Sequence, residues 1–235
     1  MPLQVEQFRY GHDNLGYLVF GPSEAMAVDG GAWQEILEFA GRHGLTLRYV
    51  THTHRHHDHV EGSDQLLERS GARLLGFEEL QDGSAIALDG EPVHVYRTPG
   101  HSIDSVCFHA GRYLLTGDTL FTGTIGNCFS GNLRAFYESV RRLMALPEDT
   151  VVFPGHDYME LAIAFARQLE PDNRDLDAYM DSHEPDCVRS LLRDELKVNP
   201  YTRFNDPNIV AILKKRGLPV DSEWERWQSL MAIEE

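Results

Sequence analysis

The chain has 235 residues, of which 42% are hydrophobic and 25% are charged, a composition typical of a globular protein with one sizeable domain and a small appendage. Its 21 basic and 37 acidic residues give a formal net charge of −16, which argues against nucleic acid or an anionic membrane as a partner. Three irregularly spaced cysteines, no apparent secretory signal and no apolar run near the ~20 residues of a membrane span predict a soluble cytoplasmic protein.

Short β-like runs alternate with turns and helices up to about residue 157. Strands are predicted where β-branched and aromatic residues lie between turn residues, and helices where apolar residues recur every three to four positions. In chain order they are strands at 16–20 and 25–28, a helix at 33–43, a strand at 45–50, a helix at 64–69, strands at 93–96, 105–108 and 112–115, a helix at 133–146 and a strand at 150–153.

The rest of the chain shows only helical patterns, at 161–169, 175–180, 186–196 and 208–215. A region of mixed strands and helices followed by helices alone predicts two parts. We expect an α/β catalytic domain over residues 1–160 and a helical C-terminal extension over residues 161–235.

A dense cluster of polar side chains directly follows the predicted strand at 45–50. His54, His56, His57, Asp58 and His59 fall within six residues. Imidazole and carboxylate groups this close together can hold metal, including two ions side by side. Packing alone would not gather five such side chains, so the cluster predicts a metal site.

Three further candidates occupy equivalent places after later strands. His101 follows the strand at 93–96, Asp118 the strand at 112–115, and His156 the strand at 150–153. Loops placed this way can meet at one rim of a sheet, and the glycine before each candidate allows a sharp turn close to a metal. Asp29 is interpreted either as a hydrogen-bonding support for the site or as a turn residue. His52 and His57 are interpreted as supporting or solvent-facing residues rather than ligands.

These motifs resemble the metallo-β-lactamase superfamily, whose Thr-His-x-His-x-Asp-His signature stands here at 53–59. The chain is similar nearly end to end to one family within it, the hydroxyacylglutathione hydrolases or glyoxalase II enzymes. The matching segments are 13–14 with 17–19, 27–29, 98–102, 117–121, 154–158, 170–173 and 199–203. The signature identifies only the superfamily, whereas Glu-Pro-Asp-Asn at 170–173 and Asn-Pro-Tyr-Thr-Arg at 199–203 point to the family.

The resemblance implies a four-layer αβ/βα sandwich with a helical C-terminal extension and two divalent metal ions per chain. Zinc is the first expectation, and the donors also suit iron or manganese. The first implied site uses three histidines, the second uses an aspartate and two histidines, and another aspartate bridges them: His54, His56 and His101; Asp58, His59 and His156; and Asp118.

The implied chemistry is hydrolysis of a small-molecule thioester. Two ions ~3.5–4 Å apart can hold a bridging hydroxide that attacks a carbonyl carbon, and Asp58 would orient it. A thiolate leaves readily because the pKa of its conjugate acid is near 8.5 in cysteine. The expected reaction converts S-D-lactoylglutathione to D-lactate and glutathione.

Substrate contacts are expected from Tyr158, Asn127 and Arg203. Tyr158 matches the family's substrate-contacting tyrosine, whereas Asn127 stands where these enzymes usually carry a basic residue in a Cys-Gly-(Arg or Lys)-Phe-Phe-Glu-Gly segment. Positive charge from Arg203, or from Lys214 and Lys215, is an alternative source of binding, although these residues equally suit a solvated helix face. Loss of a charge-assisted contact weakens binding by ~1.5–3 kcal/mol, so a different thiol carrier stays open.

Three other functions compete with this interpretation. The first is hydrolysis of another acyl-thiol or of a lactone on the same dinuclear site. The second is a mononuclear-iron persulfide dioxygenase, which is disfavoured because no Cys-Gly-Arg-Thr-like stretch follows the Gly-Asp pair at 117–118. The third is a catalytically silent metal-binding protein, which the intact ligand set disfavours. The sequence leaves open the native metal, the acyl group, the carrier thiol and the oligomeric state.

Overall fold

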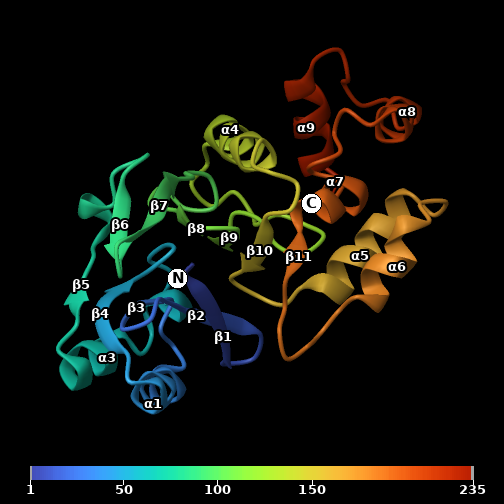
Figure 1. The fold of residues 1–235 in the computed structure, drawn as a ribbon. Coiled ribbons are helices and arrows are strands. Elements are labelled where there is room, and N and C mark those ends of the chain that lie inside the picture. The colour runs from blue at the N-terminus through green and yellow to red at the C-terminus, as the bar shows by residue number, and fades with distance from the viewer. Residues whose placement is uncertain (1, 234–235) are drawn as a thin grey trace.

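Two β-sheets lie against each other at the centre of the computed structural model, which describes residues 2–233 (Figure 1). The first sheet has the spatial order β1-β2-β3-β4-β5. Its strands are β1 (Gln4–Tyr10), β2 (Asn14–Phe20), β3 (Glu24–Val28), β4 (Thr46–Thr51) and β5 (Arg73–Leu74). Neighbours from β1 to β3 are antiparallel, whereas β4 runs parallel to both β3 and β5, so the sheet is mixed.

The second sheet is also mixed and has the order β11-β10-β9-β8-β7-β6. Its strands are β6 (Ala85–Leu88), β7 (Glu91–Arg97), β8 (Val106–Ala110), β9 (Tyr113–Gly117), β10 (Val151–Pro154) and β11 (Ser190–Leu191). Strands β6 to β9 form an antiparallel meander, β10 runs parallel to β9, and β11 runs antiparallel to β10.

Helices cover the outer faces of both sheets, α1 and α3 on the first and α4 on the second (Figure 1). The helical segments before residue 150 are α1 (Trp33–His43), α2 (His57–Val60), α3 (Ser63–Ser70), the 3-10 turn η1 (Phe77–Glu79) and α4 (Leu133–Met144). The predicted helix at 33–43 is confirmed. It ends at Gly44, whose φ of 65° is the left-handed conformation that glycine adopts without strain.

Side chains on both faces of each sheet are buried, so each sheet is covered on one face by the other sheet and on the other face by helices. The fold therefore has four layers. Tyr17 and Val19 on β2 face the core between the sheets, whereas Leu18 packs beneath α1 and α3. On β8, Phe108 faces the inter-sheet core and Cys107 packs beneath α4. Because successive strand residues point to opposite faces, this pattern requires helices outside both sheets. It confirms the predicted αβ/βα sandwich.

The chain after residue 158 is mostly helical, as predicted, and lies beside the second sheet (Figure 1). Its helices are α5 (Met159–Leu169), α6 (Asp175–Asp181), α7 (Leu192–Val198), α8 (Pro207–Lys215) and α9 (Glu223–Met231). The sequence analysis missed α9, although Ser222 and Glu225 form a reciprocal capping box at its start.

One prediction for this region was wrong. The expected helix at 186–196 is a helix only from Leu192, and Ser190 and Leu191 instead form β11 on the edge of the second sheet. Gln7 on β1 explains the difference, because its side chain accepts a hydrogen bond from the Val188 N–H at 2.7 Å and donates one to the Val188 carbonyl at 2.8 Å. These bonds replace the partners that a helix would have supplied.

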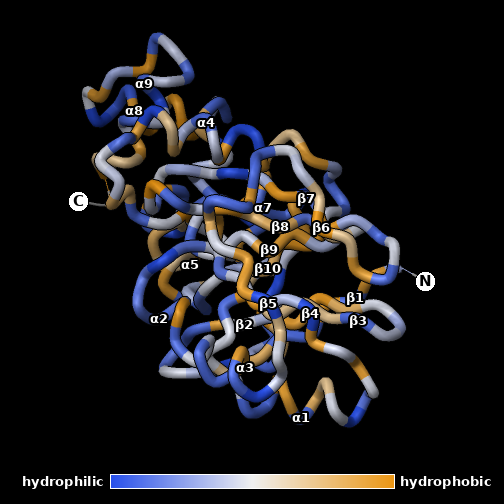
Figure 2. The backbone as a smooth tube through the Cα atoms, turned by 90° about the vertical axis from the view of Figure 1, so that its left-hand side faces the viewer, coloured by the Kyte–Doolittle hydropathy of each residue, from blue (hydrophilic) through white to orange (hydrophobic). Residues whose placement is uncertain are grey.

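Apolar residues concentrate along strands β8, β9 and β10, which are largely orange in Figure 2. Within the part of the chain that the structure describes, no helix combines the length and apolar character that crossing a bilayer requires. The predicted ligands lie in the loops that follow β4, β7, β9 and β10 and in the short helix α2 after β4, so the arrangement of these strands decides whether the ligands meet.

Candidate metal centre

The segments that follow β4, β7, β9 and β10 converge at one rim of the two sheets and bring all seven predicted ligands together. Their ligand atoms form two groups, and within each group these atoms lie within 4.8 Å of one another. The groups are His54, His56, His101 and Asp118, and Asp58, His59 and His156. Residues more than 100 positions apart in the sequence thus meet, as the loop positions predicted.

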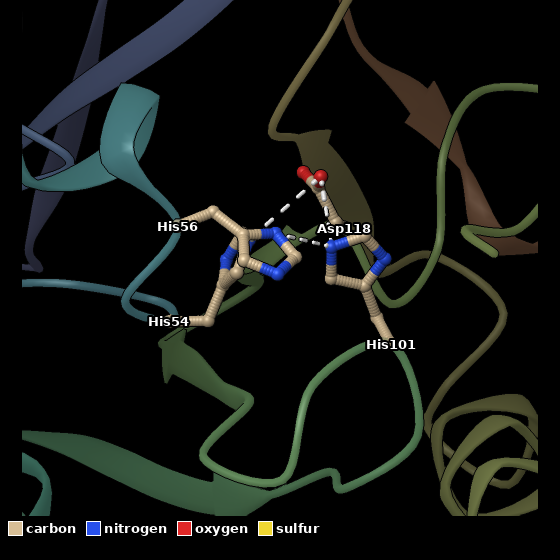
Figure 3. A group of neighbouring side chains, drawn as sticks. All are labelled: His54, His56, His101 and Asp118. Carbon is tan, nitrogen blue, oxygen red and sulfur yellow. Dashed lines mark hydrogen bonds and ion pairs between the residues drawn. The ribbon is translucent and has the colours of Figure 1, made fainter. Parts of the chain in front are cut away.

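In the first group, three imidazoles face one another beneath a carboxylate (Figure 3). His56 Nδ1 lies 2.9 Å from His54 Nε2 and 3.0 Å from His101 Nε2. Asp118 Oδ2 lies 3.3 Å from His101 Nε2 and 3.9 Å from His54 Nε2. All four ligand atoms therefore point at one small volume.

The second group is arranged in the same way around two histidines. His59 Nε2 lies 3.2 Å from His156 Nε2, and Asp58 Oδ2 lies 3.5 Å from the former and 3.3 Å from the latter. Asp118 reaches this group as well, with Oδ1 3.3 Å from His59 Nε2 and Oδ2 3.6 Å from His156 Nε2. One carboxylate therefore contacts both groups.

This geometry fits divalent metal ions. Nitrogen ligands 2.0–2.1 Å from a tetrahedral ion lie about 3.3 Å from one another, close to the 2.9–3.9 Å separations in the first group. Three imidazole nitrogens that face one another cannot all act as hydrogen-bond donors to their neighbours, whereas a cation between them accepts every lone pair. In this donor set the imidazoles suit zinc and iron, and the carboxylates suit manganese as well.

Asp29 supports the second group from within the core, as the sequence analysis considered. Its carboxylate lies 2.9 Å from His59 Nδ1 and accepts hydrogen bonds from the backbone N–H and the hydroxyl of Thr53, both at 2.7 Å. The backbone of Asp29 has a φ of 54°, an uncommon conformation for a residue with a side chain. The residue is completely buried, so its carboxylate is held by these hydrogen bonds rather than by water.

Three supporting residues were missed by the sequence analysis. Asp13 Oδ1 lies 2.9 Å from His156 Nδ1, the Asn14 amide donates to Asp58 Oδ2 at 2.8 Å, and the Tyr10 hydroxyl donates to the Asp58 carbonyl at 2.8 Å. The segment 13–14 was noticed only as part of the resemblance. Its chemistry depends on contacts 44 to 143 residues away along the chain, which no local spacing reveals.

His52 and His57 lie outside both ligand groups. His52 Nε2 is 2.6 Å from the Ser63 hydroxyl, and His57 is exposed to solvent. Both positions agree with their interpretation as supporting or solvent-facing residues.

Glycine is required beside Asp118, whose carboxylate contacts both groups. A Cβ atom on Gly155 would lie 2.3 Å from Asp118 Oδ1, and one on Gly117 would lie 2.4 Å from the Thr53 hydroxyl oxygen. Gly117 also has a φ of 49°. At both positions glycine allows the backbone to approach a neighbouring side chain more closely than a residue with a Cβ could.

The two groups differ in how they bind protons. Burial lowers the pKa of His54 to about 3 and that of His101 to about 4. Burial also opposes the charge of His59 and His156, but nearby carboxylates outweigh it and raise both pKa values, above all through Asp29 and Asp118 for His59. Burial would raise the pKa of Asp118, but His156 and His59 hold it well below its ordinary value. The Asp118 carboxylate, which contacts both groups, is therefore ionised.

The predicted substrate residues lie in different surroundings. The Tyr158 ring stacks on His156, with centroids 5.0 Å apart and planes 3° from parallel. Asn127 is exposed and lines a cavity of about 790 Å³ between its own loop and α9. Phe129 lines the same cavity, and its ring centroid lies 5.2 Å from that of His101. Phe129 therefore contacts both this cavity and a histidine of the first ligand group.

Arg203 lies within the helical extension, where its guanidinium forms ion pairs with two carboxylates. It forms a two-pronged ion pair with buried Glu170 and a further ion pair with Asp206 at 3.1 Å. A substrate anion would have to compete with both carboxylates. The structure thus gives Arg203 a role in holding the extension together, while Lys214 and Lys215 are exposed.

Two α/β layers with seven converging histidine and aspartate side chains at their rim define a metalloprotein of the αβ/βα sandwich class. Comparison with known families agrees. The metallo-beta-lactamase superfamily model matches residues 11–82 and 72–156, and the model for the hydroxyacylglutathione hydrolase C-terminus matches residues 157–233. The chain belongs to the metallo-beta-lactamase superfamily and, within it, to the hydroxyacylglutathione hydrolase family.

Relatives in sequence span most of the chain. A hydroxyacylglutathione hydrolase from Pseudoalteromonas translucida is 31% identical over 227 residues, covering 90% of this chain and 88% of the relative. Another from Chromohalobacter salexigens is 34% identical over 212 residues, covering 83% of each. Family membership therefore includes the helical extension as well as the sandwich.

Solved structures share the fold at lower identity. ETHE1 from Myxococcus xanthus is 24% identical, with a TM-score of 0.67 over 97% of this chain and 100% of that chain. A metallo-beta-lactamase from Staphylococcus aureus is 20% identical, with a TM-score of 0.67 over 90% of this chain and 66% of that chain. These likenesses establish the sandwich fold.

Proposed function

We propose that the protein is a thioester hydrolase that uses two divalent ions, zinc first, and converts S-D-lactoylglutathione to D-lactate and glutathione. The single observation that carries this proposal is the contact of one carboxylate, that of Asp118, with both ligand groups. A shared ligand suits two neighbouring ions better than one. The names of the sequence relatives supply the reaction.

Bound ions would supply Lewis acidity, which polarises a carbonyl and makes water nucleophilic near neutral pH. The chain's own groups hold the remaining components in place. Burial opposes the charge of Asp58, but His59 and the Asn14 amide lower its pKa, so it stays an anion that can accept a hydrogen bond from a water or hydroxide and orient it. Burial and nearby carboxylates raise the pKa of Tyr158 to about 12. Its hydroxyl therefore keeps the proton that it would donate to the substrate.

The cavity beside Asn127 is the proposed place for the thiol carrier. The extension supplies one of its walls through Leu218, Gln228 and Met231, which is the role we propose for residues 161–235. Its volume of about 790 Å³ falls in the range of small-molecule sites.

The charge of the residues that line this cavity favours a thiol carrier other than glutathione. Glu225 is the one charged side chain among the described residues that line it. Glutathione carries two carboxylates, which a cavity with one acidic and no basic lining residue does not pair. An acyl thioester of a neutral thiol is therefore the second candidate substrate.

Elemental analysis and a substrate panel test the proposal. We expect close to two ions per chain and turnover of lactoylglutathione, with zinc, iron and manganese added in turn. Thioesters carrying the same acyl group on glutathione and on neutral N-acetylcysteamine then separate the two carriers. A single iron per chain, or turnover of lactones without thioesters, would overturn the proposal.

A further inference from the structure

A buried carboxylate in the extension contacts the loop that carries the shared aspartate. Glu195 on α7 is completely buried. Its Oε2 atom accepts hydrogen bonds from the Gly123 backbone N–H at 2.9 Å and from the Asn199 amide at 3.0 Å, and its Oε1 atom accepts one from the Tyr179 hydroxyl. Three separate segments thus meet on one side chain.

Asn199 contacts the same loop independently. Its amide also donates to the Thr124 carbonyl at 2.9 Å. That carbonyl closes a tight turn by accepting from the Phe121 N–H at 3.0 Å. Gly123 at the tip of the turn has a φ of 84°, and a Cβ there would lie 3.2 Å from that of Ala162 on α5. The extension therefore holds both the tip and the closing carbonyl of the turn.

The base of this loop is the metal centre itself. The loop begins at Asp118 and ends at Gly126. A Cβ on Gly126 would lie 2.0 Å from the Asp118 carbonyl oxygen and 2.9 Å from His101 Nδ1. The end of the loop is thus packed against two of the four ligands in the first group, so a shift of the loop displaces them.

Burial of Glu195 needs an explanation other than stability. A buried carboxylate is costly to desolvate, and no ion pair with Glu195 exists among residues 2–233. What a fully hydrogen-bonded buried group does supply is one specified arrangement of its partners. Here the arrangement that it specifies is the position of the 118–126 loop relative to the extension.

We infer that Glu195 and Asn199 are positioning residues that lock the 118–126 loop, so that the helical extension sets the geometry of the metal ligands Asp118 and His101. This inference rests on the metal-binding function proposed above. It gives the Asn-Pro-Tyr-Thr-Arg segment at 199–203 a role at the metal centre, in addition to any role in substrate binding.

We call the pair Glu195 and Asn199 the latch. The test replaces one of these residues and then measures amide hydrogen exchange in the metal-free protein and metal affinity by chelator competition. Glu195→Leu removes the acceptor for Gly123 and Asn199 and should accelerate amide hydrogen exchange in the 117–127 segment and weaken metal affinity about tenfold in chelator competition. Glu195→Gln keeps an acceptor oxygen and should restore both to within about threefold of wild type. Burial raises the pKa of Glu195, which makes the neutral amide a close substitute.

Glu170→Leu is the matched control. It makes the same replacement at another buried carboxylate of the extension, one that pairs with Arg203. This variant should lose stability in urea but keep wild-type metal affinity and wild-type exchange in the 117–127 segment. If Glu195→Leu fails to fold, Asn199→Ala, which removes the bond to the Thr124 carbonyl, provides the same two measurements.

The outcomes separate this inference from the proposed function. Unchanged loop exchange and metal affinity in folded Glu195→Leu or Asn199→Ala would overturn the latch, as would equal losses in Glu170→Leu. A wild-type protein that binds two ions but hydrolyses no thioester would overturn the proposed function and leave the latch intact.

Discussion

The two ligand groups share Asp118 but rest on different supports. In the first group, His54 Nδ1 lies 3.1 Å from the neutral Thr53 hydroxyl, and His101 Nδ1 faces the backbone at Gly126. In the second group, each histidine has a carboxylate behind it, Asp29 for His59 and Asp13 for His156.

The difference shows how one fold can give unequal properties to two groups of similar side chains. A carboxylate behind an imidazole fixes the ring and increases its basicity. It also keeps a proton on the ring when no metal is bound, which explains why the pKa values of His59 and His156 are raised and those of His54 and His101 lowered. The second group should hold its ion more tightly and compete more with protons.

The largest effect is expected from the residue that both groups share. Asp118→Ala removes one ligand from each group, so binding of two ions should be lost and turnover should fall below detection. Elemental analysis after gel filtration gives the stoichiometry. Wild-type stoichiometry in this variant would refute the shared ligand and with it the comparison of two linked sites.

The next effect separates the groups. Asp29→Asn keeps the size of a completely buried side chain but removes its charge, so the affinity of the second group should fall ~10–100-fold. Chelator competition measures both binding steps, and the first group should change little. Asp104→Asn, which removes a charge paired with Arg55 rather than with a ligand, is the control. Equal losses at both steps would contradict the assignment of Asp29 to one group.

A smaller loss is expected from the more exposed of the two supports. The Asp13 side chain is 28% exposed, whereas that of Asp29 is 0% exposed. Because water can replace part of an exposed hydrogen bond, Asp13→Asn should weaken the second binding step by about tenfold, the low end of the range for such supports. The same chelator titration ranks the two variants, and a larger loss for Asp13→Asn would reverse the proposed order.

The smallest expected effect is a difference in the number of protons that each group releases when it binds its ion. In the metal-free protein the raised pKa values of His59 and His156 make the second group hold protons more tightly than free imidazoles do, so filling this group should release protons and its affinity should rise with pH. His54 and His101, with pKa values of about 3 and about 4, release none. Calorimetric metal titrations in two buffers of different ionisation enthalpy count the protons. Equal release at both binding steps would contradict the comparison.

Proton binding by His59 and His156 also predicts how the free energy of unfolding of the metal-free protein depends on pH. The folded chain holds these protons more tightly than the unfolded chain, whose histidine pKa is about 6.5. The resulting stabilisation is complete below that pH and disappears as pH rises through the raised folded values of His59 and His156. Urea unfolding of the metal-free protein between pH 6 and 9 measures the decline. Asp29→Asn should flatten it.

Sequence alone predicted the metal centre better than its surroundings. Seven candidate ligands could be proposed because metal coordination demands particular residue types, and the structure brings these seven side chains together at one rim. Asp13 and Asn14 were missed because their partners lie far along the chain. The helix expected at 186–196 failed for a related reason, since its first residues bond to Gln7, which is 181 positions away from Val188. Local patterns predict local structure, and long-range partners override them.

Strand β11 has a consequence for how the protein can be divided. It pairs with β10, the strand that leads into His156, and without it β10 would form the margin of the second sheet. Unpaired margins of sheets recruit other chains and promote aggregation. A fragment that ends at residue 160 would lack β11 and would therefore be prone to aggregation. The C-terminal extension, through β11, therefore covers this edge of the sandwich.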